Sequence, residues 1–153
     1  MRRDPNIIAL SREHHYGLLF CWKIRQGLAK HVDLERIRKY VLHFWKFNLQ
    51  DHFAEEELLL FRDRFDSLCL EAKQQHGLIR NLIQAINDSG VQAEINYREL
   101  ADQVDEHIRF EERQVFPFLE QKMTKEQLSA VGEHLGRLHT TPADDNYQDE
   151  FWG

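Results

Sequence analysis

Four long stretches of this chain place apolar residues at intervals of three and four, and this pattern restricts the fold more than any other feature. In the first stretch, residues 6–30, the apolar positions are Ile7, Leu10, Leu18, Cys21, Ile24 and Leu28. Residues with this spacing lie on one face of an α-helix, and the stretch is long enough for about seven turns. The chain has only 7 glycines and 3 prolines among its 153 residues, which favours long helices. We therefore expect an all-α fold.

Local signals set the start of the second and third helices. A short break at His31-Val32 precedes Asp33, a suitable N-cap for a second helix that runs to about Arg62. Asp66 or Ser67 caps a third helix, which stops at residues 87–90, where Asn, Asp, Ser and Gly follow one another.

The fourth helix starts near residues 93–94 and contains Pro117 late in its length. Because proline lacks a backbone donor, we expect it to kink or weaken the last turn. Thr124 and Gln127 fit a capping box that begins a shorter fifth helix ending near His139.

Short loops between long amphipathic helices predict an up-down-up-down four-helix bundle, here with a short fifth C-terminal helix. We expect one domain over residues 1–140, with residues 141–153 as a polar C-terminal tail. The tail either docks on the bundle or stays mobile.

Histidine and glutamate occupy inward positions of two of these helices, where a purely structural bundle would have leucine. His52 is followed four residues later by Glu56, and His107 is followed by Glu111 in the same way. Residues four apart share one helix face. Two such helices facing each other would bring two imidazoles and two carboxylates into one volume.

The other two helices supply histidines at the same depth in the bundle. His52 and His76 both lie roughly 14–15 Å from the loop that joins their helices, at ~1.5 Å per residue. The first helix offers His14 and His15, which point about 100° apart because they are adjacent. Apolar periodicity favours His14, but His15 has Leu18 and Leu19 at its own three-four positions and remains a candidate.

The predicted ligand set suits a pair of transition-metal ions. It comprises histidines from all four helices and two glutamates, namely His14 or His15 with His52, Glu56, His76, His107 and Glu111. Such ligands fit iron, manganese or zinc, and two cations would offset the cost of burying two carboxylates. Two iron ions would retain open positions for oxygen, nitric oxide or peroxide. We expect four further glutamates to be solvated neighbours of the centre, namely Glu13, Glu55, Glu57 and Glu112. One of them could hydrogen-bond to a metal-binding side chain without binding the metal itself.

Composition and motifs exclude several other functions. The net charge of −6 argues against nucleic-acid binding. No apolar run reaches the ~20 residues that span a bilayer, and the N-terminus lacks the long apolar region of a signal peptide, so we expect a cytoplasmic protein without membrane contact. Cys21 and Cys69 are expected to be buried, reduced thiols. There is no catalytic Ser–His–Asp or Cys–His pattern, phosphate-binding loop or dinucleotide fingerprint. The ferritin-type Glu-x-x-His motif is also missing.

These motifs resemble the hemerythrin-like, HHE cation-binding family over residues ~7–120. The similarity lies in Arg12-Glu13-His14-His15, in His52 with Glu56, in His76, and in the run from His107 through Glu111 and Glu112 to Val-Phe-Pro117. The resemblance implies a four-helix bundle with a non-haem di-iron centre that binds oxygen or related small ligands.

Two positions differ from the oxygen-carrying hemerythrins. Those proteins have two histidines four apart on the third helix, whereas His76 is flanked at that spacing by Ala72 and Arg80. They also use an aspartate five residues after the fourth-helix histidine, where this chain has Glu112. The chain therefore resembles four-histidine members of the family, among them iron- or oxygen-sensing domains and di-iron proteins of iron–sulfur cluster repair.

The sequence thus predicts a di-iron protein that binds a small diatomic or peroxide ligand for sensing, storage or detoxification. One alternative is a di-iron redox enzyme or an iron donor in cluster repair, and another is a metal-free or zinc-binding interaction module. The sequence identifies no protein partner.

Overall fold

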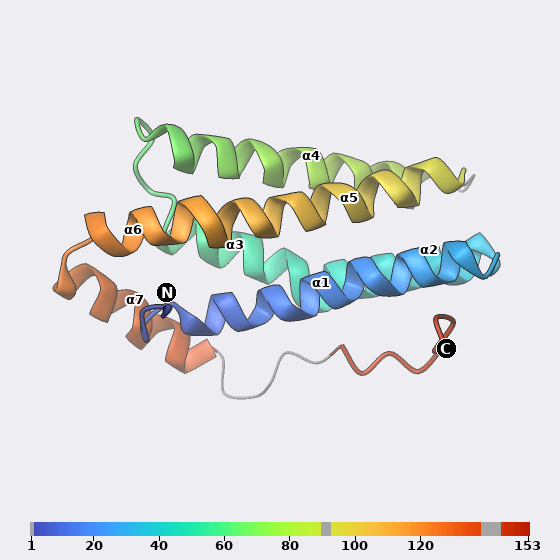
Figure 1. Ribbon diagram of the computed structural model, residues 1–153, viewed down its shortest axis with the longest axis horizontal. Helices are drawn as coiled ribbons and strands as arrows, with labels where there is room; N and C mark the ends of the chain where they lie inside the picture. Colours follow the sequence, from blue (N-terminus) through green and yellow to red (C-terminus); the bar gives the residue numbers. More distant parts are fainter. Residues whose placement is uncertain (1, 90–92, 139–144) are drawn as a thin grey trace.

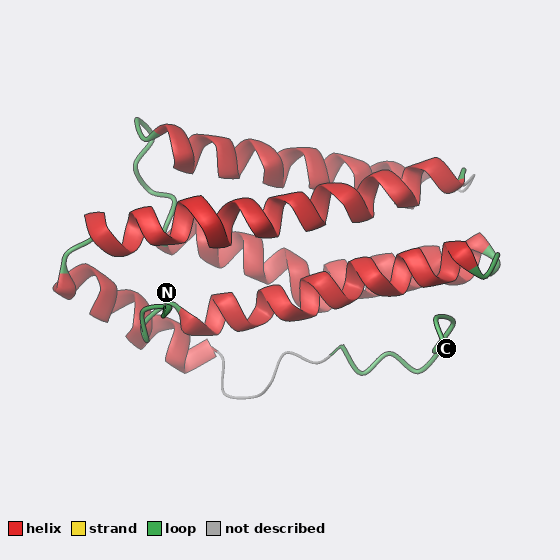
Figure 2. Ribbon diagram, in the orientation of Figure 1, coloured by secondary structure: helices red, strands yellow, loops and turns green. Residues whose placement is uncertain are grey.

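The structure is a computed structural model that describes residues 2–89, 93–138 and 145–153. Figures 1 and 2 show an all-helical arrangement, without a β-strand in any of these three ranges. The helices are α1 (Ile8–Ala29), α2 (Leu34–Phe44), η1 (Trp45–Leu49), α3 (Gln50–Leu59), α4 (Ser67–Ser89), α5 (Glu94–Phe110), η2 (Glu111–Val115), α6 (Phe116–Lys122) and α7 (Lys125–Leu138), where η denotes a π-helical turn.

Four long helical spans run side by side, and this confirms the predicted bundle (Figure 1). They are α1, the continuous span α2–η1–α3, α4, and the continuous span α5–η2–α6. The helix α1 packs on α5 and on the second span, and α4 packs on α5 and α2. The shorter α7 is the predicted fifth helix; its expected end at His139 and the predicted domain boundary after residue 140 lie outside the described residues.

The caps form where the sequence predicts them. The Asp33 carboxylate accepts a hydrogen bond from the Glu35 backbone N–H at the start of α2. Of the two candidates before α4, Asp66 accepts from the Cys69 backbone N–H at 2.9 Å. Thr124 and Gln127 bond reciprocally, each side chain accepting from the other's backbone N–H, at 3.1 and 2.9 Å. These bonds satisfy donors that a helix start leaves without partners.

The second and fourth spans each contain a π-helical turn that the sequence pattern did not indicate. Pro117 is the second residue of α6, which begins directly after η2 and continues to Lys122, so the last turn is not where the helix is disturbed. The expected effect of proline is therefore displaced toward the N-terminus. The ring of a helical proline clashes with the carbonyl four residues earlier, here Arg113 within η2, and the wider turn accommodates it.

Two apolar clusters divide the interior along the bundle axis. The larger one fills the end where α1 meets α2 and includes Phe20, Ile24, Tyr40, Phe44, Ile79, Ile83, Tyr97, Leu100 and Val104. The smaller one fills the other end, beside α7, and includes Ile7, Leu10, Phe61, Cys69, Ala72, Val115, Phe116, Leu119, Val131 and Leu135. Buried histidines and glutamates occupy the layer between them.

The described part of the C-terminal segment, residues 145–153, docks against α1 and α2. Phe151 is buried in the larger apolar cluster. The Lys23 ammonium lies 3.0 Å from the Asp145 carboxylate and 4.0 Å from the centre of the Trp152 ring. The Tyr40 hydroxyl donates to the same carboxylate at 2.6 Å. Of the two alternatives for this segment, these contacts support docking.

Two further expectations concern the cysteines and the membrane. Cys21 and Cys69 are both buried and free, as predicted. Across the part of the chain that is described, every helix is too short or too polar to cross a membrane.

Candidate metal centre

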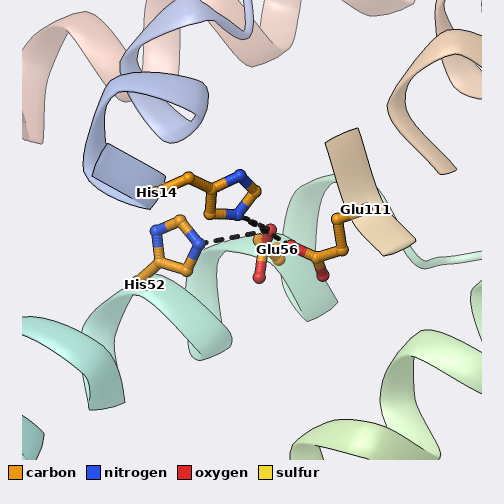
Figure 3. A group of neighbouring side chains, drawn as sticks. All are labelled: His14, His52, Glu56 and Glu111. Atoms are coloured by element: carbon orange, nitrogen blue, oxygen red, sulfur yellow. Dashed lines mark hydrogen bonds and ion pairs between the residues drawn. The ribbon is translucent and has the colours of Figure 1, made fainter. Parts of the chain in front are cut away.

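Six of the seven predicted site residues converge in the polar layer between the apolar clusters. They form two groups whose ligand atoms lie within 4.8 Å of one another: His14, His52, Glu56 and Glu111 in one group, and Glu56, His76, His107 and Glu111 in the other. Both groups are wholly buried, and both contain the same two glutamates. Figure 3 shows the first group, with both histidines directed at the shared carboxylates.

The seventh predicted residue, His15, lies outside this arrangement. Its side chain is exposed, and its ring packs against Tyr16 at 5.4 Å between ring centres. Because consecutive helical residues point about 100° apart, a helix that directs His14 inward directs His15 away. The structure thus brings His14 and not His15 into the buried layer.

One histidine comes from each of the four helical spans, at a common level. The ring centres of His14 and His52 are 5.0 Å apart, and those of His76 and His107 are 4.7 Å apart. We call these two sets the His14–His52 pair and the His76–His107 pair. The equal depths expected from the lengths of the helices are therefore found in the fold.

The Nε2 atoms of the histidines face the shared carboxylates. His14 Nε2 lies 2.8 Å from Glu111 Oε1, and His107 Nε2 lies 3.0 Å from Glu111 Oε2. His52 Nε2 and His76 Nε2 lie 3.3 and 3.1 Å from the Glu56 oxygens. Four nitrogens and four oxygens therefore converge on one small volume.

Most of these converging atoms have no hydrogen-bond partner, although they are buried. They are Nε2 of three histidines and three carboxylate oxygens, namely His52 Nε2, His76 Nε2, His107 Nε2, Glu56 Oε1, Glu56 Oε2 and Glu111 Oε2. A buried polar atom without a hydrogen bond costs ~1–3 kcal/mol, and a charged one costs more. Metal ions at the focus of these atoms would remove that cost, so the donor set fits a pair of borderline cations.

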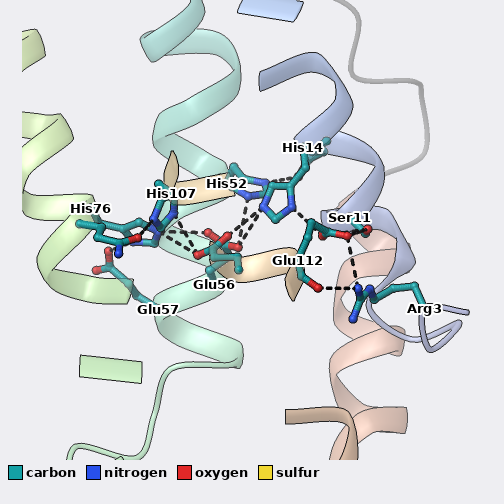
Figure 4. A network of polar contacts seen from close by, with 12 residues as sticks. Arg3, Ser11, His14, His52, Glu56, Glu57, His76, His107 and Glu112 are labelled. Carbon is teal, nitrogen blue, oxygen red and sulfur yellow. Dashed lines mark hydrogen bonds and ion pairs between the residues drawn. The ribbon is translucent and has the colours of Figure 1, made fainter. Parts of the chain in front are cut away.

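The outward-facing nitrogen of each histidine is held by a second acceptor. His14 Nδ1–H donates to Glu112 at 2.7 Å, His52 Nδ1–H to Glu13 at 2.8 Å, His76 Nδ1–H to Glu57 at 2.6 Å, and His107 Nδ1–H to Gln75 at 2.7 Å. These bonds fix the tautomer that leaves Nε2 free to bind a metal. Figure 4 shows the four histidines with two of these acceptors, Glu57 and Glu112, and it shows Ser11 and Arg3 beside Glu112.

Three of these acceptors correct the sequence interpretation. Glu13, Glu57 and Glu112 were expected to be solvated neighbours, but each receives a hydrogen bond from a histidine of the centre. Gln75, which no sequence motif singles out, is the fourth acceptor. The only sequence signal for them is adjacency, since each of the four directly precedes or follows a buried histidine or glutamate of the centre.

The carboxylates strongly perturb the pKa values of the metal-free centre. Burial alone would lower the pKa values of His14, His52 and His76, but the neighbouring glutamate carboxylates outweigh it and raise them. The pKa of His52 is raised to about 9, and that of His76 to about 10. Burial would raise the pKa of Glu111, yet the neighbouring histidines hold it well below its usual range. Without metal, protons on these three imidazoles would therefore offset the charge of the carboxylates.

The π-helical turn η2 presents two consecutive glutamates to one imidazole. Glu111 Oε1 lies 2.8 Å from His14 Nε2, and Glu112 Oε2 lies 2.7 Å from His14 Nδ1. Both residues belong to η2. π-Helical turns are frequent at functional sites, where the extra residue changes the direction of the side chains.

A small cavity adjoins the centre on the side of the larger apolar cluster. The volume open to the centre of a water-sized molecule is about 20 Å³. Its polar wall includes His14, His52 and His107, and its apolar wall includes residues such as Gly17, Phe44, Leu49, Phe53 and Ile108. A water molecule needs about 10–15 Å³ on this measure, so the cavity has room for a ligand of two or three atoms.

Comparison with known proteins gives one result. The model of the Hemerythrin HHE cation binding domain matches residues 6–119 of the chain. The match begins just before α1 and ends within α6, so it includes every histidine and glutamate of the centre. No curated protein and no solved structure matches the chain.

Proposed function

This chain belongs to the hemerythrin HHE cation binding domain family, and from that premise we propose that it holds two iron ions in one non-haem centre and binds a small ligand beside them. The observation that carries this proposal is the set of two overlapping, fully buried His/Glu groups. Each group offers two imidazoles, and the two glutamates common to both would hold the ions close together.

The chain's own residues determine what the centre could do. Four imidazoles and two carboxylates would leave two six-coordinate irons with open positions, at which a neutral or anionic small ligand could bind. Bound iron would supply electrons to oxygen or peroxide. The cavity beside His14, His52 and His107 supports ligands of only a few atoms. We therefore propose oxygen, nitric oxide or peroxide as the ligand, for sensing, storage or detoxification in the cytoplasm.

The decisive test is the metal content of protein purified without added metal, together with its ultraviolet–visible spectrum before and after reduction and re-exposure to air. We expect about two irons per chain and absorption bands that change reversibly. Zinc alone, or no metal after anaerobic loading with Fe(II), would overturn the proposal. Iron without any spectral response to oxygen, nitric oxide or peroxide would exclude the small-ligand function.

A matched pair of variants separates the centre from incidental iron binding. Glu56→Ala removes a carboxylate that both groups contain, so we expect the variant to lose both irons. His15→Ala removes an exposed imidazole one residue from His14, and it should keep both irons. Equal metal contents in the two variants would show that the iron is bound elsewhere.

A further inference from the structure

The two halves of the centre differ in the groups that support their histidines. Both members of the His14–His52 pair donate to carboxylates, those of Glu112 and Glu13. In the His76–His107 pair, His76 donates to the carboxylate of Glu57, whereas His107 donates to the amide oxygen of Gln75. The inner ligands are otherwise matched, with two imidazoles on each side and two shared glutamates.

Arginines do not cancel this difference. Arg3 lies 3.4 Å from the carboxylate of Glu112, and Arg80 lies 2.8 Å from that of Glu57, so each half has one arginine beside one supporting carboxylate. The Arg80 guanidinium also lies 5.7 Å from the centre of the Phe53 ring, which stacks on His76 at 3.8 Å. The positive charge of Arg80 therefore lies nearer to the half with fewer carboxylates.

The supporting group changes how strongly an imidazole binds a cation. A carboxylate that accepts the Nδ1–H bond raises the basicity of Nε2 more than a neutral amide does, because negative charge favours partial transfer of the proton. Changing such a supporting group typically alters metal affinity by roughly 10–100-fold. We infer that the two metal positions are inequivalent, and that the position at the His14–His52 pair takes the first divalent cation, with the His76–His107 pair filling second. This inference rests on the proposed binuclear centre.

Two separate binding steps would not by themselves prove this order. Two cations that share Glu56 and Glu111 repel each other, so even identical positions would bind the second ion more weakly than the first. In that symmetric case, weakening either position would leave the first step almost unchanged, because the first ion would use the unaltered position. The order is therefore tested by asking which step each variant changes.

The experiment is a titration of metal-free protein with Co²⁺, followed by calorimetry and by the visible absorption of the bound ion. The matched variants are Glu13→Gln and Glu57→Gln, which each replace one supporting carboxylate by an amide of the same shape. We expect Glu13→Gln to weaken the first step by roughly tenfold or more. Glu57→Gln should leave the first step within about twofold and weaken the second step by roughly 10–100-fold.

A third variant tests the same inference by adding a supporting carboxylate instead of removing one. Gln75→Glu gives His107 a carboxylate, so it should tighten the second step and bring the two constants closer together. Circular dichroism and the stoichiometry of two ions would confirm that each variant keeps its fold and both positions. A general structural disturbance would weaken both steps alike.

The possible outcomes separate the inference from the proposed function. If Glu13→Gln and Glu57→Gln both leave the first step unchanged and weaken the second equally, the positions are equivalent and the inference is overturned. If Glu57→Gln alone weakens the first step, the order is the reverse. If the unaltered protein binds neither two Co²⁺ nor two Fe²⁺ ions, the proposed binuclear centre itself fails.

Discussion

Two clusters of charged side chains are buried in the described part of the protein, and their polar groups are paired in different ways. In the C-terminal ion cluster, formed by Lys23, Tyr40, Asp145 and Trp152, the Lys23 ammonium and the Tyr40 hydroxyl both donate to the Asp145 carboxylate. In the His/Glu centre, six buried nitrogens and oxygens face one another without completing hydrogen bonds. The polar groups of the first cluster are paired within the protein and join two parts of the chain, whereas the unpartnered atoms of the second fit a pair of cations.

Burial of charge alone would not have distinguished these clusters. The side chains of Lys23 and Asp145 are only 7% and 8% exposed, nearly as buried as those of His14 and His52, which are each 5% exposed. What differs is whether polar atoms have partners inside the protein. Four predictions test this distinction, from the largest expected effect to the smallest.

Metal removal should have the largest effect, and it should act only through the His/Glu centre. An ion at 100 times its dissociation constant stabilises a protein by ~2.7 kcal/mol, so two ions contribute roughly 5 kcal/mol. For a domain of this size that corresponds to a fall in melting temperature of roughly 10–20 °C on chelation. Calorimetry of iron-loaded and chelated protein measures it. An unchanged melting temperature would mean that the centre, like the C-terminal cluster, is complete without ions.

Replacing Lys23 by methionine should destabilise the protein by roughly 3 kcal/mol, because Asp145 would remain buried without its cation. The loss should be equal in the metal-loaded and metal-free proteins, since Lys23 does not contact the centre. Denaturant unfolding of both forms measures it. Arg36→Met is the matched control, because its ion pair with Asp149 is exposed and should contribute nothing measurable. A Lys23→Met variant as stable as this control would show that the buried pair is not needed.

The pH dependence of stability should separate metal-free from metal-loaded protein. The pKa values of His52 and His76 are raised to about 9 and about 10, so their contribution is complete below pH 6.5 and is lost as pH rises through these values. The metal-free protein should therefore lose stability between about pH 6.5 and 10. Iron-loaded protein should not, because the ions replace the protons and bind more tightly as the imidazoles deprotonate.

The loss of stability at low pH tests the C-terminal ion cluster. Burial would raise the pKa of Asp145, but Tyr40 and Lys23 outweigh this and lower it below its usual 3.8, so the stability from this carboxylate is lost as pH falls below that value. On the alkaline side, the account given for the His/Glu centre would be contradicted if metal-free and iron-loaded protein lost stability in parallel as pH rises.

His15→Ala should have the smallest effect. The side chain is exposed and its contact is with the neighbouring Tyr16 ring, so the free energy of unfolding should change by less than about 0.5 kcal/mol. Metal content and the spectrum should be unchanged, as measured by elemental analysis and absorption. Loss of an iron would show that His15 turns inward on loading and that the first helix supplies two ligands.

The sequence predicted the parts of this structure that depend on one helix at a time. The three caps, the four amphipathic spans and the inward faces of His52 with Glu56 and of His107 with Glu111 follow from spacing along a single segment. The choice of His14 over His15 also followed from the apolar periodicity of one helix. The prediction that the histidines of the four helices lie at equal depth required only the helix lengths and the short loops.

The missing parts depend on how separate helices approach each other. Glu13 lies on α1 and supports His52 on α3, and no spacing in the sequence records that contact. Gln75 on α4 likewise supports His107 on α5. The π-helical turns insert a residue without a local signature, and docking of residues 145–153 depends on Lys23, 122 residues earlier in the chain. Contacts of this kind are fixed by packing in three dimensions.

The position of the centre between two apolar clusters has a consequence for the rate at which its ions exchange. Glu56, His76 and Glu111 are fully inaccessible, and apolar side chains close both ends of the bundle. A charged chelator would reach ions bound there only when helices part, whereas a neutral diatomic gas would diffuse through the packed hydrocarbon interior. The half-life of the loaded centre should then be governed by helix opening and should become independent of chelator concentration. Retention of bound metal would thus depend on the rate of helix opening as well as on affinity.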